Sequence, residues 1–383
     1  MKTQPVYLDH AATTPVRPEV VEAMLPYLTE VYGNPSSVHA FGRESRLALD
    51  RFRDSIADML DCAPRELVFT GSGSESDNLA VRGTLQAMPG KGHIVTTSVE
   101  HHAVLNTFRQ LEREGYDVTY LPVDEYGQVD PQVLESALRP DTLLVSVMYG
   151  NNEVGTLQPI ETIGRICKER GILFHSDAVQ ALGSVPIRLS QLPVDLMSFS
   201  AHKINGPKGV GLLYVKNKTR ISPIIYGGNQ ERKLRAGTEN MAGIAGLAKA
   251  LELAVREQPE HAKEMESLRA SFLLTLMSEL GEEGIVVNGH PSSRLPHILN
   301  VSFPGISAET MLMNMDLEGI AASSGAACTA GSLEPSHVLK AMGLKEDRVL
   351  SAVRFSFGRG NVHESVTNAA RKIATIARRL RSK

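Results

Sequence analysis

The sequence predicts an α/β protein in which a mainly parallel sheet, covered by helices on both faces, is followed by a smaller α+β domain. Three observations predict this. Short β-rich runs alternate with helical patterns between residues 67 and 215, which is typical of βαβ units. One run, residues 143–148, is almost entirely apolar, as a strand covered on both faces should be. After about residue 255 the pattern changes to a charged helical stretch and a few short strands.

The elements of the first part follow from their local patterns. Pro15 and Pro18 disfavour helix before about residue 19, so residues 7–15 should form an extended arm and turn. Apolar residues recur at helical spacing over residues 43–60. The β-rich runs predict seven strands, over residues 67–70, 93–97, 118–121, 143–148, 172–175, 196–200 and 210–215.

The C-terminal part is predicted to have a different organisation. Residues 256–280 should form a charged helix interrupted at Pro259. Strands are expected over residues 285–287 and 298–303, and a helix near 308–317. We therefore expect a large domain over residues 15–255, and a small domain built from residues 1–14 and 256–383.

The composition restricts the class of protein. The 383 residues are 42% hydrophobic and 22% charged, which is typical of a globular protein with a substantial core. The net charge of -3 gives no reason to expect nucleic acid as a partner, and no apolar run approaches the ~20 residues of a membrane helix. The N-terminal residues lack a signal-peptide pattern, and three cysteines do not make a disulfide framework, so we expect a cytoplasmic protein.

A lysine follows the predicted strand 196–200, in the run Ser200-Ala201-His202-Lys203. Ligands of parallel sheets bind beyond the carboxyl ends of the strands. A buried ammonium is costly, so a lysine there needs a partner or a chemical purpose. One such purpose is nucleophilic attack on an aldehyde cofactor, of which pyridoxal phosphate is the commonest. The alternative is a lysine whose stem packs while its charge reaches water.

Other polar residues follow other predicted strands. Gly73 and Ser74 begin a helix, where N–H groups and the helix dipole favour a phosphate, although a simple helix cap is the alternative. Asp177 follows the strand 172–175; its carboxylate could keep a pyridine nitrogen protonated, or cap the next helix. Gln180 could reach the phenolic oxygen of the same ring.

Two adjacent histidines, His101 and His102, come shortly after the strand 93–97. Adjacent rings rarely bind one ion, and no cysteine or carboxylate cluster completes a site, so we expect no resident metal. His101 is better interpreted as a flat ring that stacks on an aromatic cofactor and moves protons, in a chain that has no tryptophan. A histidine hydrogen-bonded for structure alone is the alternative.

Cys328 lies in a run of small residues, 323–332, that has no apolar anchor. Such a segment is expected to be mobile and its thiol exposed, which suggests a nucleophile that travels. Cys167, by contrast, shares a helical apolar stripe and should lie in the core. Arg354 alternates with apolar residues on a predicted strand; its guanidinium could bind a substrate carboxylate or form a structural ion pair.

Together these motifs resemble the cysteine desulfurases, which are class V aminotransferase-like enzymes. The resemblance covers nearly the whole chain and is most specific at residues 7–15, 75–78, 151–155, 200–203, 235–238 and 323–338, the last being similar to the active-cysteine loop of the group I enzymes. It implies the pyridoxal-phosphate-dependent transferase fold type I, with a seven-stranded sheet. It also implies an enzyme that converts L-cysteine to L-alanine and leaves a persulfide on Cys328.

The resemblance further implies a role for each matching residue. The cofactor ring would be held by Lys203 (covalently), Asp177 (at the pyridine nitrogen), Gln180 (at the ring oxygen), Asn152, and His101, which stacks and moves protons. The phosphate would be held by Gly73, Ser74, Ser200 and His202, and by Thr238 from the other subunit of a homodimer. Asn152 and Arg354 would bind the cysteine carboxylate.

Cys328 would then pass its sulfur to an acceptor, either an iron–sulfur scaffold or a tRNA-thiolating enzyme, and it could transiently ligate an iron–sulfur cluster. Two features depart from the family. Gly73-Ser74 stands where relatives often have Ala-Thr, although the hydroxyl is kept, and the chain stops at Lys383 without the longer tail of many scaffold-docking relatives. The acceptor therefore stays open.

Three alternative functions also stay open: a selenocysteine lyase, a small-molecule aminotransferase, and a non-catalytic sulfur-trafficking scaffold. The loop thiol argues against the aminotransferase. The presence of both Lys203 and Cys328 argues against the scaffold.

Overall fold

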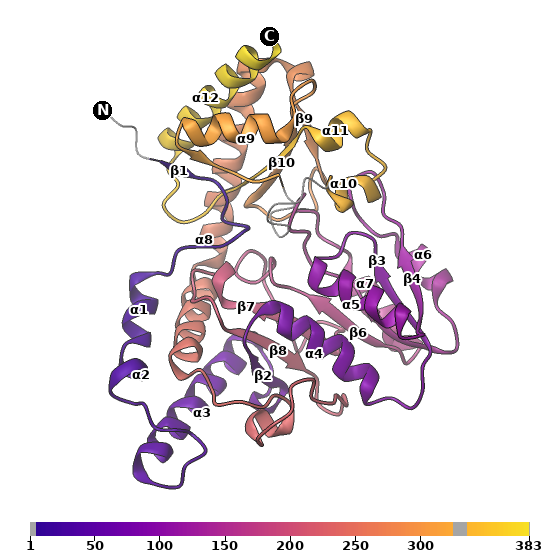
Figure 1. Cartoon of the computed structure of the whole chain (residues 1–383), viewed down its shortest axis with the longest axis vertical. Helices are drawn as coiled ribbons and strands as arrows, with labels where there is room; N and C mark the ends of the chain where they lie inside the picture. Colours follow the sequence, from indigo (N-terminus) through magenta and orange to yellow (C-terminus); the bar gives the residue numbers. More distant parts are fainter. Residues whose placement is uncertain (1–4, 325–334, 383) are drawn as a thin grey trace.

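A seven-stranded sheet forms the centre of the larger part of the molecule in a computed structural model, which describes residues 5–324 and 335–382 (Figure 1). The strand order is β2-β8-β7-β6-β5-β3-β4. The strands are β2 (Leu67–Thr70), β3 (His93–Thr97), β4 (Asp117–Leu121), β5 (Thr142–Ser146), β6 (Leu173–Asp177), β7 (Leu196–Ser200) and β8 (Gly211–Val215).

The sheet is mainly parallel, which confirms the predicted fold class. Strands β7, β6, β5, β3 and β4 pair in parallel, whereas β8 is antiparallel to both β7 and β2. All seven predicted strands are present, with ends that differ by up to two residues. Strand β6 extends to Asp177, so this carboxylate is carried by the last residue of the strand instead of the loop after it.

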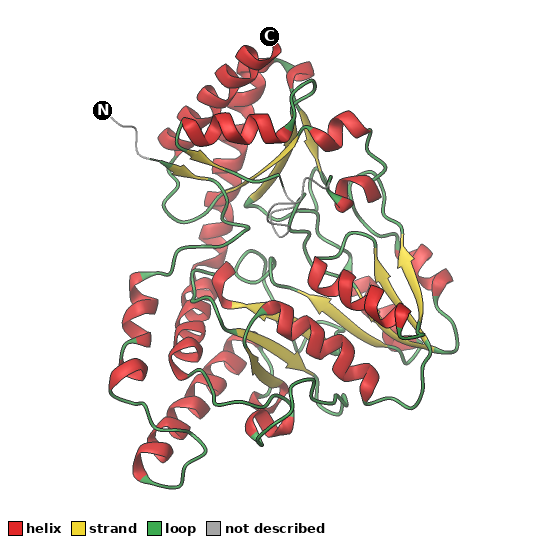
Figure 2. Cartoon of the chain, in the orientation of Figure 1, coloured by secondary structure: helices red, strands yellow, loops and turns green. Residues whose placement is uncertain are grey.

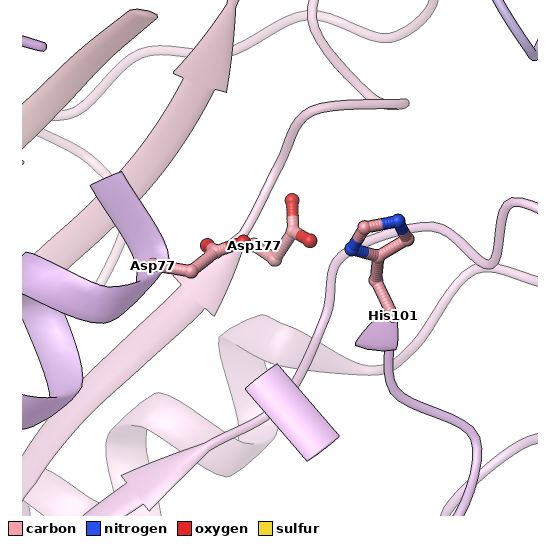
Figure 3. A group of neighbouring side chains, drawn as sticks. All are labelled: Asp77, His101 and Asp177. Carbon is pink, nitrogen blue, oxygen red and sulfur yellow. The ribbon is translucent and has the colours of Figure 1, made fainter. Parts of the chain in front are cut away.

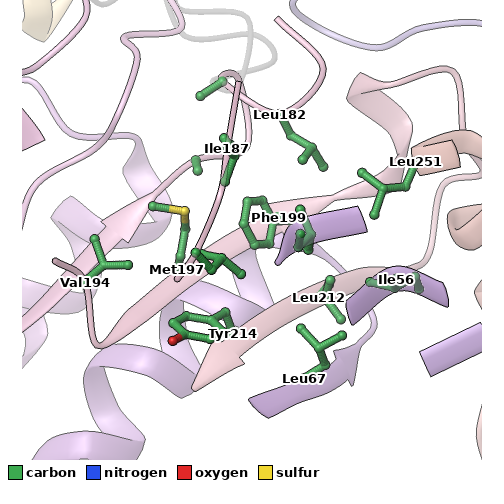
Figure 4. Close-up of a cluster of buried hydrophobic side chains, with 14 of the residues drawn as sticks. Ile56, Leu67, Leu182, Ile187, Val194, Met197, Phe199, Leu212, Tyr214 and Leu251 are labelled. Carbon is green, nitrogen blue, oxygen red and sulfur yellow. The ribbon is translucent and has the colours of Figure 1, made fainter. Parts of the chain in front are cut away.

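Helices cover both faces of this sheet (Figure 2). Neighbouring strand residues contact different helices, because successive side chains of a strand point to opposite faces. Ile94 packs with residues of α4 (Gly73–Gln86) and α5 (His102–Arg113), whereas Val95 belongs to the core shared with α3 (Ala40–Leu60) and α7 (Ile160–Glu169). In the core that contains Val95, Phe199 and Tyr214 lie among aliphatic side chains (Figure 4).

The remaining described strands form two smaller sheets. Strand β10 (Ile298–Ser302) lies between β9 (Val286–Asn288) and β12 (Ala352–Ser356), antiparallel to both. Strand β1 (Val6–Tyr7) pairs in parallel with β11 (Ile320–Ala321), which attaches the N-terminal arm to this part. The helices here are α9 (Ala308–Leu317), α10 (His337–Ala341), α11 (Glu346–Leu350) and α12 (His363–Arg381). A separate core cluster includes Phe272, Phe355 and Phe357.

One helix of 40 residues, α8 (Met241–Leu280), connects the two parts. The prediction that the helical stretch is interrupted at Pro259 is wrong, because α8 continues through it. Pro259 is exposed, and so is Val255, whose carbonyl oxygen loses its N–H partner. Water can therefore replace that partner, and the helix tolerates the proline. The division of the chain at about residue 255 stays a prediction, since α8 crosses it without a break.

Two short helices, α1 (Pro18–Met24) and α2 (Pro26–Thr29), lie between the arm and α3, and α6 (Pro131–Ala137) lies between β4 and β5. Pro18 occupies the start of α1, where a missing N–H costs nothing. Among the described helices, none combines the length and apolar character that crossing a membrane requires.

Candidate functional site

A cavity of about 290 Å³ lies at the carboxyl ends of the parallel strands. It is lined by ten of the twelve residues that the sequence predicts for the site: Gly73, Ser74, His101, Asn152, Asp177, Gln180, Ser200, His202, Lys203 and Arg354. Thr238 does not line it and is exposed on the surface of this chain. Cys328 lies outside the described residues.

Lys203 lies in a 3₁₀ turn, residues Ala201–Lys203, that directly follows β7. Its Nζ donates hydrogen bonds to the carbonyl oxygens of Ala11 (2.6 Å) and Ala12 (2.8 Å). The N-terminal arm is itself held at this place, because the Thr14 hydroxyl donates to the His202 carbonyl oxygen at 2.7 Å. The arm therefore supplies acceptors for the lysine charge inside the cavity.

The N-terminus of α4 forms one end of the cavity. Ser72 caps this helix by accepting a hydrogen bond from the Glu75 N–H at 3.1 Å, and Gly73 and Ser74 line the wall. A Cβ atom at Gly73 would lie 2.8 Å from Val179 Cγ2 and 3.3 Å from Ser200 Cβ, so a larger residue would have to displace the wall. This end combines helix-terminal N–H groups with two serine hydroxyls, which suits an anion.

Asp177 forms the floor of the cavity and is 6% exposed. One oxygen, Oδ1, accepts a hydrogen bond from the Val179 N–H at 2.9 Å. Residues 179–184 form turns, and the described residues between β6 and β7 contain no helix, so the helix-capping role considered for this residue is wrong. Burial raises the pKa of its carboxyl to about 6, and the nearby Lys203 charge opposes that rise. At neutral pH the carboxylate is ionised and suited to a cationic ring nitrogen.

Asp77 is a site residue to which sequence reasoning gave no role. It lies on the buried face of α4, four residues after Gly73, and it too lines the cavity. The carboxyl is 1% exposed, and burial together with the neighbouring Asp177 raises its pKa well above the ordinary value. Figure 3 shows the Asp177 side chain between those of Asp77 and His101. The sequence did contain a signal for Asp77: it lies four residues after Gly73, and this spacing puts both residues on the same face of a helix.

His101 is the N-cap residue of α5, and its Nδ1 accepts a hydrogen bond from the Ala103 N–H at 3.2 Å. Burial and the positive charge of Lys203 lower its pKa to about 4, so the imidazole is neutral at pH 7. The ring thus has a structural role at the helix end. It also lines the cavity opposite Asp177, where a flat ring can stack.

Gln180 and His202 are held by the N-terminal arm. The Gln180 Nε2 donates to the Ala11 carbonyl oxygen at 2.9 Å, and His202 Nδ1 lies 3.1 Å from the Thr13 hydroxyl. Burial and the charge of Lys203 lower the pKa of His202 to about 4, so its imidazole is neutral.

Arg354 extends from β12 into the cavity and is 2% exposed. Its Nη1 donates to the Asn152 carbonyl oxygen at 2.8 Å, and its Nη2 pairs with Asp9 Oδ1 at 2.9 Å. The structural ion pair considered for this residue is therefore present. Within the described part of the chain, Arg354 Nε is buried without a hydrogen-bond partner, which leaves one donor for a ligand anion.

Asp77, His101 and Asp177 each place one possible ligand atom within 4.8 Å of the others. The charge of Lys203 acts on His101 and Asp177, and a cation there would meet that repulsion. We interpret the group as the floor and wall of an organic cofactor site, and the absence of a resident metal stays a prediction.

The residues present fit pyridoxal phosphate. The N-terminus of α4 with Ser74 and Ser200 suits a phosphate, the carboxylate of Asp177 suits a protonated ring nitrogen, and the primary amine of Lys203 suits an aldehyde. The neutral ring of His101 suits an aromatic face. The guanidinium of Arg354, which supplies a further buried donor, suits the carboxylate of an amino acid.

Comparisons with known proteins agree with this chemistry. Residues 6–368 match the family model of the class-V aminotransferases. The chain is 51% identical over 379 residues to a putative cysteine desulfurase IscS 1 of Bacillus subtilis (strain 168), covering 98% of this chain and 99% of the relative. It is 46% identical to the cysteine desulfurase IscS of Dictyoglomus turgidum, covering 98% of this chain and 95% of the relative.

Solved structures extend the likeness to the fold. A NifS-like protein matches with a TM-score of 0.91 and 41% identity, covering 97% of this chain and 99% of that one. SspA in complex with cysteine matches with a TM-score of 0.80 and 36% identity, covering 93% of this chain and 100% of that one. This chain therefore belongs to the class-V aminotransferase family, within its group of cysteine desulfurases.

Proposed function

We propose that this chain is a pyridoxal-phosphate-dependent cysteine desulfurase, which converts L-cysteine to L-alanine and receives the sulfur on Cys328. The observation that carries the proposal is the arrangement of Lys203, Asp177 and His101 around one cavity that Arg354 also lines. The identity of about half of all positions with proteins named cysteine desulfurases supports it.

When bound, pyridoxal phosphate withdraws electrons from the Cα of an amino-acid substrate. Asp177 supports this by holding a proton at the ring nitrogen. The neutral imidazole of His101 and the amine of Lys203 can each accept and return a proton at the reacting carbon or sulfur. The donor at Arg354 Nε orients the substrate by its carboxylate.

Cys328 acts as a nucleophile in this proposal. Its thiolate forms an S–S bond with the substrate sulfur while the substrate C–S bond breaks, and the electron pair left on carbon takes up a proton to give alanine. The persulfide is then passed to an acceptor protein, an iron–sulfur scaffold or a tRNA-thiolating enzyme, by thiol exchange. We place the reaction in the cytoplasm, since a reactive thiol suits a reducing compartment.

A homodimer is part of the proposal. Large apolar side chains gather from α2 to the start of α3, where Leu28, Tyr32, Val38 and Phe41 are exposed. The rings of Tyr32 and Phe41 stack with their centres 5.8 Å apart. Such a surface favours association. Thr238, exposed on its own chain, would then reach the phosphate in the partner subunit.

The test is to incubate the purified protein with L-cysteine and to measure L-alanine and protein-bound persulfide. We expect equal amounts of the two in the first turnover. Cys328→Ala should keep the cofactor absorbance and lose the persulfide, whereas the matched control Cys62→Ala, at a partly buried thiol, should keep both. Pyruvate in place of alanine, or persulfide in Cys328→Ala, would contradict the proposal.

A further inference from the structure

Among the described residues, side chains and not another strand cover the outer edge of β2. Strand β2 is at the end of the seven-stranded sheet, so its outer N–H and C=O groups need other partners. The Glu231 carboxylate accepts a hydrogen bond from the Phe69 N–H at 2.9 Å. The Leu67 carbonyl oxygen accepts from Arg53 Nη1 at 2.8 Å and from Arg232 Nη2 at 2.6 Å.

Glu231 and Arg53 form a buried ion pair at this edge. Arg53 Nη2 lies 2.5 Å and Nη1 lies 2.9 Å from the two carboxylate oxygens, and the side chains are 9% and 2% exposed. The guanidinium also lies 4.5 Å from the centre of the Phe69 ring. Removing one partner of such a pair leaves an uncompensated buried charge, so the pair holds its two segments firmly together.

The backbone that carries Glu231 is strained. Glu231, Arg232 and Lys233 have φ values of 44°, 56° and 69°, in the left-handed region that residues with a Cβ rarely occupy. Three consecutive residues of this kind persist only when the surrounding contacts impose the conformation. The contacts of Glu231 with Arg53 of α3 and with the Phe69 N–H of β2 are the ones that do so here.

The same segment reaches the anion end of the cofactor cavity. Arg235 Nε lies 2.8 Å from Glu75 Oε1, and Glu75 Oε2 accepts from the Gly71 N–H at 2.8 Å. Gly71 precedes the start of α4, and Glu75 lies in the first turn of this helix beside Gly73 and Ser74. Thr238 follows Arg235 by three residues. The segment 231–238 therefore contacts β2, which leads into α4, and, through Glu75, the first turn of α4.

We propose that Glu231 is a positioning residue for phosphate binding. The turn that it holds fixes the start of α4, residues 71–74, of its own site through Arg235, and presents Thr238 to the site of the partner subunit. The second half of this inference rests on the proposed function, because it requires the homodimer. The first half concerns one chain and is tested separately.

The test uses Glu231→Gln and Arg235→Gln, with Glu114→Gln as the matched control. Glu114, at the end of α5, pairs with Arg82 near the C-terminal end of α4, and neither residue lines the cavity. Each cofactor-free protein is titrated with pyridoxal phosphate, with inorganic phosphate, and with pyridoxal, which lacks the phosphate. Both variants should bind pyridoxal phosphate at least roughly tenfold more weakly, the loss expected for a misplaced hydrogen bond to a charged group.

If Glu231 and Arg235 only stabilised the fold, their substitution would lower the affinities for pyridoxal phosphate and for pyridoxal by the same factor. We expect the affinity for inorganic phosphate to fall in parallel with that for pyridoxal phosphate, while the affinity for pyridoxal stays within about twofold. If Glu231→Gln fails to fold, Arg235→Gln decides the question, because that ion pair is partly exposed. Wild type that does not bind pyridoxal phosphate contradicts the proposed function; wild-type affinity in Arg235→Gln contradicts this inference alone.

Discussion

Glu100 gives the most direct test of the electrostatics of the site. The residue precedes His101 and is fully buried; its Oε1 accepts hydrogen bonds from the Thr97 hydroxyl at 2.8 Å and the Met148 N–H at 2.9 Å. Its other oxygen is buried without a partner among the described residues. Burial raises the pKa of the Glu100 carboxyl from 4.5 to about 8, and the two hydrogen bonds offset only part of that rise.

A raised carboxyl pKa lowers stability as the pH rises. Between the unfolded and folded values the folded state binds a proton that the unfolded state has lost, so wild type should lose about 1.4 kcal/mol of stability per pH unit from this group. The loss is complete above the folded pKa. Glu100→Gln keeps an acceptor oxygen and cannot ionise. Relative to the variant, wild type should therefore lose at most about 4 kcal/mol between pH 5 and pH 8.

The assay is urea unfolding of both cofactor-free proteins, followed by circular dichroism from pH 5 to pH 9. Glu114→Gln is the control, because hydrogen bonds from Gln110 and Arg82 lower the pKa of Glu114. Glu114 is thus ionised in both states across this range, and the difference between Glu114→Gln and wild type should be independent of pH. If the difference between wild type and Glu100→Gln is also independent of pH, the reasoning about burial at this site is refuted.

Three further predictions concern residues that would hold the cofactor or the substrate. Asp177→Asn should lower the rate of alanine formation by at least roughly a hundredfold, because the ring nitrogen loses its anionic partner; a rate near wild type in a steady-state assay would contradict this. Arg354→Lys should raise the KM for L-cysteine roughly tenfold or more, since the lysine lacks the guanidinium geometry, and an unchanged KM counts against the carboxylate role. Thr238→Ala should weaken pyridoxal phosphate binding, and co-expression with Lys203→Ala should restore one working site per mixed dimer; no restored activity would argue against a site shared between subunits.

Much of the fold could be predicted because its signals are local. Apolar runs such as residues 143–148 identify strands covered on both faces, and the stripe that contains Cys167 places that thiol in a core where it is 0% exposed. The error at Pro259 arose because a proline ends a helix only where its lost hydrogen bond cannot be replaced, and exposure of that position is a property of the tertiary structure.

The candidate site could be predicted where a residue follows a strand, as Lys203 and His101 do, since strand ends of a parallel sheet meet at one edge. Contacts between distant segments could not. The hydrogen bonds of Lys203 to the carbonyl oxygens of Ala11 and Ala12 join residues about 190 positions apart, and the burial of Asp77 depends on the helix that carries it docking onto the sheet. Neither leaves a pattern in the local sequence.

The central claim is that the amine of Lys203 carries the cofactor in the cavity at the ends of β3, β6 and β7. The most direct measurement is to reduce the holoenzyme with borohydride, digest it, and locate the modified peptide by mass spectrometry. We expect the reduced cofactor on the peptide that contains Lys203, and no modification of that peptide in Lys203→Ala. A cofactor fixed to any other lysine, with Lys203 unmodified, would contradict the account.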